Sequence, residues 1–201
     1  MLKCGEVLVW RARLDRIPAG NLPPLLPAEA ERAARFHAEE ARQRYIRSHG
    51  VLRAILARLD LPTVFERDHL GKPRLASPDV WFNLSRSHGV ALYAISRGAA
   101  VGVDIERLRP LPEHLAIAER FLPPSHYQAL RDAPSGGRER EFFRLWTRLE
   151  ASLKAAGSGL YGAGRELEGE WTIEEIEAGE GFAAAVAVQG PGYRVVVADF
   201  K

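Results

Sequence analysis

The sequence predicts an α+β protein made of two similar α/β halves of about 100 residues each, packed together. Each half offers helices followed by about three strands. The length of 201 residues suits one large unit or two small units in close contact. We place the halves at residues 1–109 and 110–201, although no residue-level repeat accompanies them.

The first half opens with a strand over residues 6–12, followed by a proline-rich link over residues 18–27. A long helical region is predicted from residue 28 to residue 59, ended by Pro62. Its second part carries apolar residues at helical spacing, namely Leu52, Ile55, Leu56 and Leu59. Three strands are predicted next, over residues 81–85, 90–95 and 100–106.

The second half is predicted to begin with a helix that carries Leu115, Ala118 and Phe121 on one face. Prolines 123 and 124 break this helix, and Ser125 is the expected N-cap of the next one. A loop over residues 132–137 precedes a longer helix over residues 138–156, with Gly157 as its C-cap. The apolar stripe of this helix is predicted to consist of Phe142, Trp146, Leu149 and Leu153. The closing strands are predicted over residues 171–176, 182–188 and 193–200.

The composition is that of an ordinary globular protein, with 46% hydrophobic and 27% charged residues. The sequence contains neither a long apolar run nor a signal peptide at its start, so we expect a cytoplasmic protein without a membrane partner. A net charge of +2 does not indicate a nucleic-acid partner. The single cysteine, Cys4, has no partner for an internal disulfide.

Two carboxylates stand two residues apart in the predicted strand 100–106. Strand alternation places Asp104 and Glu106 on the same face, about 6.5 Å apart. At an effective dielectric constant near 20, their repulsion is on the order of 2.5 kcal/mol, which favours a bound cation. Mg²⁺ is the obvious cation because it takes oxygen ligands from carboxylates and phosphates. The alternative interpretation is a solvated edge strand with two surface acids.

A second acidic element lies in the predicted helix 138–156. Glu150 and Lys154 are four residues apart, so they lie one helical turn from each other. One interpretation is a surface ion pair that stabilises the helix by a few tenths of a kcal/mol. The other makes Glu150 a third metal ligand or a general base, with Lys154 facing a phosphate.

These motifs together resemble the double signature of the 4'-phosphopantetheinyl transferases, in particular the two-half Sfp-like branch. The matching segments are Gly102-Val103-Asp104-Ile105-Glu106 and Trp146-Thr147-x-x-Glu150-Ala151-x-x-Lys154. Upstream, Gly71-Lys72-Pro73 and Phe82-Asn83-Leu84-Ser85 also resemble family segments. The resemblance spans residues 25–160 and implies a pseudo-dimer with its active site at the junction of the halves.

The resemblance implies transfer of the phosphopantetheine arm of coenzyme A to a serine of an acyl, peptidyl or aryl carrier protein. Adenosine 3',5'-bisphosphate would leave. Asp104, Glu106 and Glu150 resemble the acidic set around Mg²⁺, which neutralises charge in phosphoryl-type transfer. Glu150 would be the base, directly or through a water, and Lys154 would steady the phosphates. One chain supplies both sides of the cleft, which implies a monomer.

The resemblance also assigns residues to coenzyme A, our expected co-substrate. They are Arg32, Arg44, Lys72, Pro73, Ser85 and Arg86. Most arginines of residues 28–59 are interpreted as the solvent-exposed face of a helix. In this region only Arg44 and, as second choice, Arg32 are assigned to coenzyme A. Arg86 stands where the family usually has histidine, and Leu149 where it commonly has lysine.

These two departures leave an alternative function open. A catalytically weak member of the family would act as a binding module for coenzyme A or a carrier protein. A Mg²⁺-dependent phosphohydrolase is a third interpretation, because the same acidic set would serve hydrolysis. The Sfp-like branch often serves polyketide or non-ribosomal peptide synthases, and some members serve fatty-acid or lysine pathways.

Overall fold

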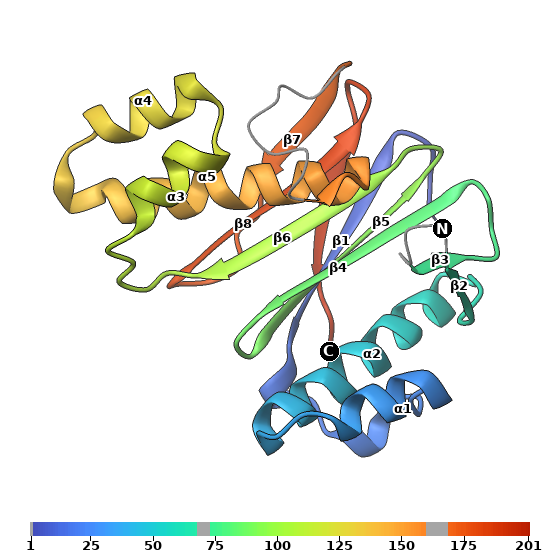
Figure 1. Ribbon diagram of the computed structural model, residues 1–201. Helices are drawn as coiled ribbons and strands as arrows, with labels where there is room; N and C mark the ends of the chain where they lie inside the picture. The colour runs from blue at the N-terminus through green and yellow to red at the C-terminus, as the bar shows by residue number, and fades with distance from the viewer. Residues whose placement is uncertain (1, 68–72, 160–168) are drawn as a thin grey trace.

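The computed structural model describes residues 2–67, 73–159 and 169–201, and it confirms a mixed α+β fold (Figure 1). The helices of these residues are α1 (Pro27–Ala34), α2 (Glu39–Arg58), α3 (His114–Phe121), α4 (Pro124–Asp132) and α5 (Ser135–Ala156). The strands are β1 (Glu6–Arg13), β2 (Phe65–Arg67), β3 (Pro73–Leu75), β4 (Val80–Ser87), β5 (Val90–Arg97), β6 (Val101–Arg107), β7 (Trp171–Glu175), β8 (Phe182–Gln189) and β9 (Arg194–Asp199). None of the helices in these ranges has the length and apolarity needed to cross a lipid bilayer.

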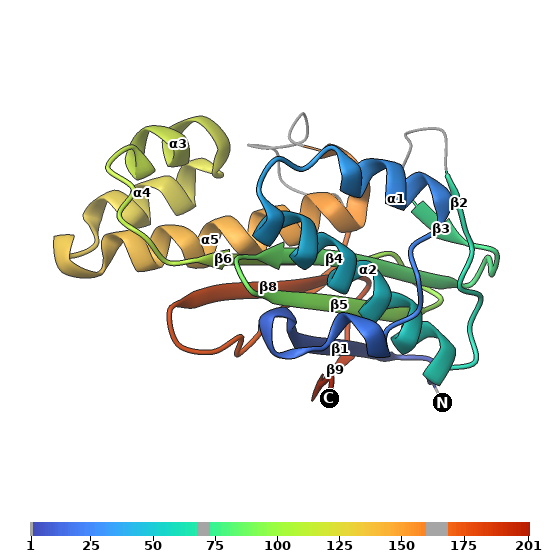
Figure 2. The same cartoon turned by 90° about the horizontal axis from the view of Figure 1, so that it is seen from below.

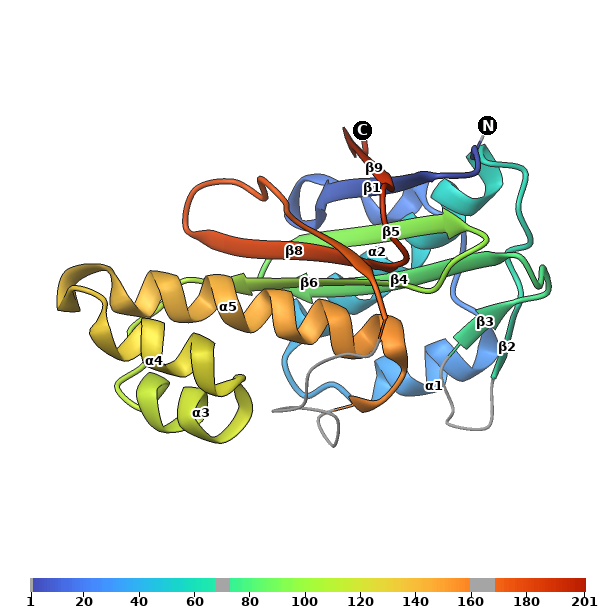
Figure 3. The same ribbon diagram turned by 90° about the horizontal axis from the view of Figure 1, so that it is seen from above.

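Two sheets form the centre of the molecule. The first has the strand order β4-β5-β1-β9, with β9 parallel to β1, and the second is antiparallel with the order β6-β8-β7. The sheets stack, with α1 and α2 outside the first and α5 outside the second (Figures 2 and 3). Their facing sides bury a core of small aliphatic residues that includes Val7, Val9, Val103, Ile105 and Val186.

The topology crosses the boundary that we placed at residue 109. Strand β6 lies before this boundary, yet it pairs with β8 in the second sheet. Strand β9 lies after the boundary, yet it pairs with β1 in the first sheet. Each of the two ranges therefore contributes one strand to the sheet that is built mainly from the other range. The division into two halves stays a prediction.

The helical region predicted over residues 28–59 consists of two helices with a break between them, which the sequence did not indicate. The chain leaves α1 after Ala34 and re-enters a helix at Glu39, through an extended Ala38. This break lets Phe36 pack against Tyr45, with their ring centroids 5.2 Å apart. A tertiary contact has overridden helix propensity here.

Two predicted helix starts in the second half are also wrong. Helix α5 begins at Ser135, inside the predicted loop 132–137, and its N-cap is Pro134. Ser125 lies inside α4, whose N-cap is Pro123. In both cases a proline directly before the helix fixes the backbone at its start. The end of α5 is as predicted, because Gly157 takes the left-handed conformation with φ of 72°.

Helix α5 approaches β6 so closely that only glycine fits at the contact. A Cβ atom on Gly102 would lie 2.0 Å from the Ala151 carbonyl oxygen and 2.5 Å from the Ala155 amide nitrogen. Both are backbone atoms of α5, so they move only if the helix moves. Gly102 therefore sets the distance between β6 and the helix that carries Glu150 and Lys154.

We expect Gly102→Ala to lower the free energy of unfolding by about 1–3 kcal/mol, because the added methyl forces α5 away from β6. Urea denaturation followed by circular dichroism measures the change. Gly136→Ala is the control, because a Cβ there meets open space and alanine favours the helix by up to about 1 kcal/mol. Equal stability of Gly102→Ala and wild type would show that α5 adjusts without cost.

Candidate functional site

Strand β6 presents two carboxylates on the face opposite the core. Val103 and Ile105 point between the sheets, so the alternate residues Asp104 and Glu106 face outward toward α5 and β4. The Asp104 side chain is only 6% exposed and that of Glu106 is 29% exposed. The predicted pairing of both acids on one face is therefore the observed geometry.

The Asp104 carboxylate is held by two residues from other elements. Its Oδ1 accepts a hydrogen bond from the Ser85 hydroxyl at 2.8 Å and pairs with the Lys154 ammonium at 2.5 Å. The Lys154 ammonium also lies 3.2 Å from the Ser85 hydroxyl oxygen. The second oxygen, Oδ2, is buried without a hydrogen-bond partner among the described residues. A buried carboxylate oxygen without a partner is costly, so it favours a further cationic ligand.

Side chains of β4 attach this strand to β6, although the two strands belong to different sheets. The Asn83 side-chain oxygen accepts from the Val103 amide at 3.0 Å, and the Ser87 hydroxyl oxygen accepts from the Arg107 amide at 3.0 Å. With Ser85, these residues form a polar row at alternate positions of β4. Asn83 and Ser87 satisfy backbone donors at the edge of β6 that pair with no strand in the described part of the chain.

Glu106 has weaker local partners than Asp104. Its Oε2 accepts from the Ser87 hydroxyl at 3.5 Å and pairs with Arg109 at 3.2 Å. Our sequence interpretation assigned no role to Asn83 or Ser87. Polar residues at every second position, 83, 85 and 87, indicate in the sequence that this face of the strand is polar.

Glu150 lies half-buried on the neighbouring turn of α5. Burial raises the pKa of its carboxyl above the ordinary value, Lys154 opposes this rise, and the charges of Asp104 and Glu106 increase it. The three acids therefore share one electrostatic environment. Among the described residues they do not by themselves form a cluster at metal-binding distances.

The donor set nevertheless fits a hard divalent cation. The oxygens of Asp104, Glu106 and Glu150 are the ligand type that Mg²⁺ takes, and Asp104 Oδ2 is buried without a partner in the described part of the chain. A cation bound at this oxygen would satisfy it and lower the repulsion that raises the pKa of Glu150.

A cavity of about 380 Å³ lies on the other face of β4, against α1 and α2. Its lining includes Arg32, Tyr45, His49, Pro73 and Leu84. This volume is within the range of small-molecule sites, which is about 300–1,000 Å³. The cavity therefore has room for part of a substrate of that size.

Cationic groups gather around Tyr45 beside this cavity. The guanidinium carbon of Arg32 lies 5.9 Å from the centroid of the Tyr45 ring, and that of Arg86 lies 5.2 Å from it. Burial lowers the pKa of Arg86, and the charge of Arg32 lowers it further. Two guanidinium groups that repel each other favour an anion between them.

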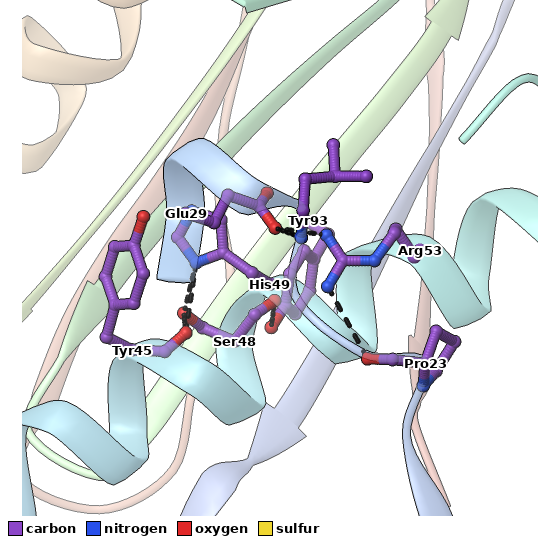
Figure 4. A network of polar contacts seen from close by, with 8 residues as sticks. Pro23, Glu29, Tyr45, Ser48, His49, Arg53 and Tyr93 are labelled. Carbon is purple, nitrogen blue, oxygen red and sulfur yellow. Dashed lines mark hydrogen bonds and ion pairs between the residues drawn. The ribbon is translucent and has the colours of Figure 1, made fainter. Parts of the chain in front are cut away.

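A buried polar network fixes α1 on α2 behind the cavity (Figure 4). Arg53 and Glu29 form an ion pair at 2.6 Å, with side chains 5% and 14% exposed. Glu29 also accepts from the Leu26 amide at 2.9 Å, which caps the start of α1. The His49 ring nitrogen Nδ1 lies 3.0 Å from the Tyr45 carbonyl oxygen, and burial lowers the pKa of this histidine.

The residues assigned to coenzyme A do not all lie at one place in the structure. Arg32 and Pro73 line the cavity, and Arg86 lies beside it. Ser85, on the opposite face of β4, contacts Asp104 instead. Lys72 lies outside the described residues.

Arg44 is not among the residues that line this cavity. Its guanidinium group binds Asp15 in a fork, with nitrogen to oxygen distances of 3.0 and 2.9 Å, and pairs with Glu40 at 2.5 Å. Nothing in the local sequence indicates the contact with Asp15. Tyr45 and His49, which our sequence interpretation missed, were indicated only by their helical spacing of four residues.

Leu149, the second departure from the family pattern, packs half-buried beside the aromatic cluster of α3, α4 and α5. It lies next to Glu150 in sequence but contributes to the core rather than to the acidic site. This agrees with its predicted place in the apolar stripe of α5.

Comparison with known proteins gives consistent results. Residues 100–187 match the 4'-phosphopantetheinyl transferase superfamily. The chain is 34% identical to the 4'-phosphopantetheinyl transferase HetI of Nostoc sp., over 96% of this chain and 92% of HetI. It is 26% identical to the 4'-phosphopantetheinyl transferase Sfp of Bacillus subtilis, over 85% of this chain and 80% of Sfp. It is 41% identical to psf-1 of Bacillus pumilus, also a 4'-phosphopantetheinyl transferase, over 48% of this chain and 41% of psf-1.

We expect Glu150→Gln to stabilise the metal-free protein at neutral pH. A carboxyl whose pKa is raised by folding contributes stability at low pH, and this contribution is lost as the pH rises through the raised value. Urea denaturation in EDTA should therefore show a higher free energy of unfolding for Glu150→Gln than for the wild type at pH 8. This difference should become smaller as the pH falls toward 4.5.

Glu141→Gln is the matched control on the same helix. Arg144 lowers the pKa of Glu141, so this substitution should lose stability at pH 8, the opposite sign. If both variants changed stability in the same direction at pH 8, the buried position of Glu150 would not control its ionisation.

Proposed function

Because the chain belongs to the 4'-phosphopantetheinyl transferase superfamily, we propose that it transfers the arm of coenzyme A to a serine of an apo carrier protein. Adenosine 3',5'-bisphosphate would be the second product. The observation that carries this proposal is the position of β4, which lies between the acidic site and the cationic cavity. Ser85 and Arg86, adjacent in sequence, face these two sites on opposite sides of the strand.

The cavity between α1, α2 and β4 would hold the nucleotide part of coenzyme A. Arg32 and Arg86 would bind its phosphates, because guanidinium groups form strong charge-assisted hydrogen bonds to phosphate oxygens. Arg86 keeps the positive charge that histidine supplies elsewhere in the family, but it stays charged across the working pH range. Arg44 remains a candidate for this role, provided that phosphate competes with Asp15.

The diphosphate of coenzyme A would extend around the end of β4 toward Asp104 and Lys154. Glu150 would accept the proton of the carrier serine, whose oxygen then forms a bond to the phosphorus next to the pantetheine. The bond from that phosphorus to the bridging oxygen breaks, and the nucleotide phosphate leaves with both electrons of the bond. The Lys154 ammonium would neutralise charge on the leaving phosphate.

We propose Mg²⁺ as the metal, held by Asp104, Glu106 and Glu150. Such an ion neutralises phosphate oxygens and stabilises charge that develops during the transfer. We also propose that the enzyme works as a monomer in the cytoplasm.

The proposal is tested by incubating the protein with Mg²⁺, coenzyme A and a panel of apo carrier proteins. We expect a mass gain of one phosphopantetheine arm on at least one carrier and an equal amount of adenosine 3',5'-bisphosphate. Coenzyme A binding without modification of any carrier would favour the alternative function, a catalytically weak binding module, which the departures at Leu149 and Arg86 suggested. Release of pantetheine phosphate without a carrier would favour a phosphohydrolase.

We expect Asp104→Ala to reduce turnover by more than about 100-fold, because changes even to the groups around metal ligands cost 10–100-fold. The more conservative Asp104→Asn should lose as much, since it keeps the shape but not the charge. Asp132→Ala, which removes an exposed acid of α4, is the control. Carrier modification measures turnover, and near wild-type activity of Asp104→Asn would exclude a role in metal binding.

Arg86→Ala should raise the KM for coenzyme A about tenfold or more and change kcat little, since a hydrogen bond to a charged group contributes roughly 1.5–3 kcal/mol. Arg120→Ala, an exposed arginine of α3, is the control. Steady-state kinetics at a saturating carrier concentration separate the two constants. An unchanged KM for coenzyme A would place the substrate outside the cavity beside Tyr45.

A further inference from the structure

A second cavity, of about 540 Å³, lies at the far end of the first sheet. Its lining residues come from the end of β1 and the turn after it, from the last two turns of α2, and from the end of β9 and the residues that follow it. It shares no lining residue with the cavity beside Tyr45. Its α2 residues are Ala54 and Arg58, on later turns of the helix than Tyr45 and His49.

The lining of this cavity concentrates positive charge. Four arginines and one lysine line it, against the single carboxylate of Asp199: Arg11, Arg13, Arg16, Arg58 and Lys201. The whole chain, by contrast, is nearly neutral, with 28 basic and 26 acidic residues. Like charges around one concave surface repel each other and raise the local concentration of anions.

Two of the arginines are fixed by their own contacts. Arg11 holds Asp199 in a fork, with nitrogen to oxygen distances of 2.8 and 3.2 Å, and also donates to the Glu177 carbonyl. The guanidinium carbon of Arg58 lies 4.3 Å from the centroid of the Phe200 ring. These contacts position both guanidinium groups, and Arg11 compensates the charge of the Asp199 carboxylate.

The other two arginines have open guanidinium groups. Arg13 and Arg16 are exposed, and neither forms an ion pair or hydrogen bond with a described residue. Arg13 lies over Gly179, where a Cβ would come within 2.9 Å of its Nη2. The cavity therefore combines two arginines that are held by neighbouring residues, Arg11 and Arg58, with two whose N–H donors can bind a ligand, Arg13 and Arg16.

We propose that this cavity, the arginine cavity, binds a small phosphate-bearing molecule at a site separate from the active site. Arg13 and Arg16 would take the phosphate, because guanidinium donors match phosphate oxygens in number and geometry. Ile17, Pro18 and Phe200 would contact the rest of the molecule. The volume favours a small molecule, since such sites measure about 300–1,000 Å³.

The test compares the wild type with the double variant Arg13→Ala/Arg16→Ala by NMR titration with inorganic pyrophosphate and with adenosine monophosphate at low salt. We expect both probes to shift the amide signals of the non-proline residues of 14–19 and of residues 199–201 in the wild type. Their dissociation constants at these signals should rise about tenfold or more in the double variant, as two charge-assisted contacts are lost.

Arg131→Ala/Arg140→Ala is the matched control, because it removes the same charge from exposed positions of α4 and α5. Its affinity at the arginine cavity should equal that of the wild type. Melting curves verify that both double variants fold. The amide signals of Ser85 and Lys154 show separately whether a probe binds at the active site. If the arginine cavity binds neither probe, the proposed transferase function is therefore unaffected.

Two results would overturn the proposal. One is a wild-type titration in which signals near Ser85 shift while those of residues 14–19 and 199–201 do not. The other is an equal loss of affinity in both double variants, which would mean that the probes respond only to net charge.

Discussion

The ion pair between Asp104 and Lys154 is the interaction on which the rest of the site depends. The carboxylate is almost fully buried, and burying a charge is unfavourable unless cations and hydrogen-bond donors compensate for the lost water. Lys154 supplies the cation from α5, and Ser85 supplies the donor from β4. Lys154 reaches Asp104 because the absence of a side chain at Gly102 lets α5 approach β6. One buried charge thus fixes a helix and two strands of different sheets in a common geometry.

Strand β4 connects the two chemical environments of the molecule. Its polar row of Asn83, Ser85 and Ser87 satisfies groups on β6, while Arg86 on the other face lies beside Tyr45. A substrate with a nucleotide at one end and a reactive diphosphate further along would use both faces in turn. The proposed transfer therefore relies on β4 to fix the distance between the groups that would bind the nucleotide and the groups that would react.

The departures from the family pattern are accommodated in different ways. Arg86 keeps a cation beside the cavity where the family usually has histidine. Leu149 turns toward the aromatic cluster of α3 to α5, where it packs instead of binding a phosphate. Arg44 is engaged by Asp15 and Glu40, whereas Arg32 lines the cavity and Arg86 lies beside it. The family's chemistry is thus compatible with a changed set of supporting cations.

The sequence by itself determined those features that arise from local periodicity. Alternation along a strand placed Asp104 and Glu106 on one face, and helical spacing gave the apolar stripe of α5 and its end at Gly157. Only the tertiary structure decided the break between α1 and α2, the pairing of β6 with β8 and of β9 with β1, and the partners of Lys154 and Arg44. Lys154 and Asp104 are 50 residues apart, and Arg44 and Asp15 are 29 apart. Contacts over such separations depend on which surfaces are buried together, and local residue patterns do not contain that information.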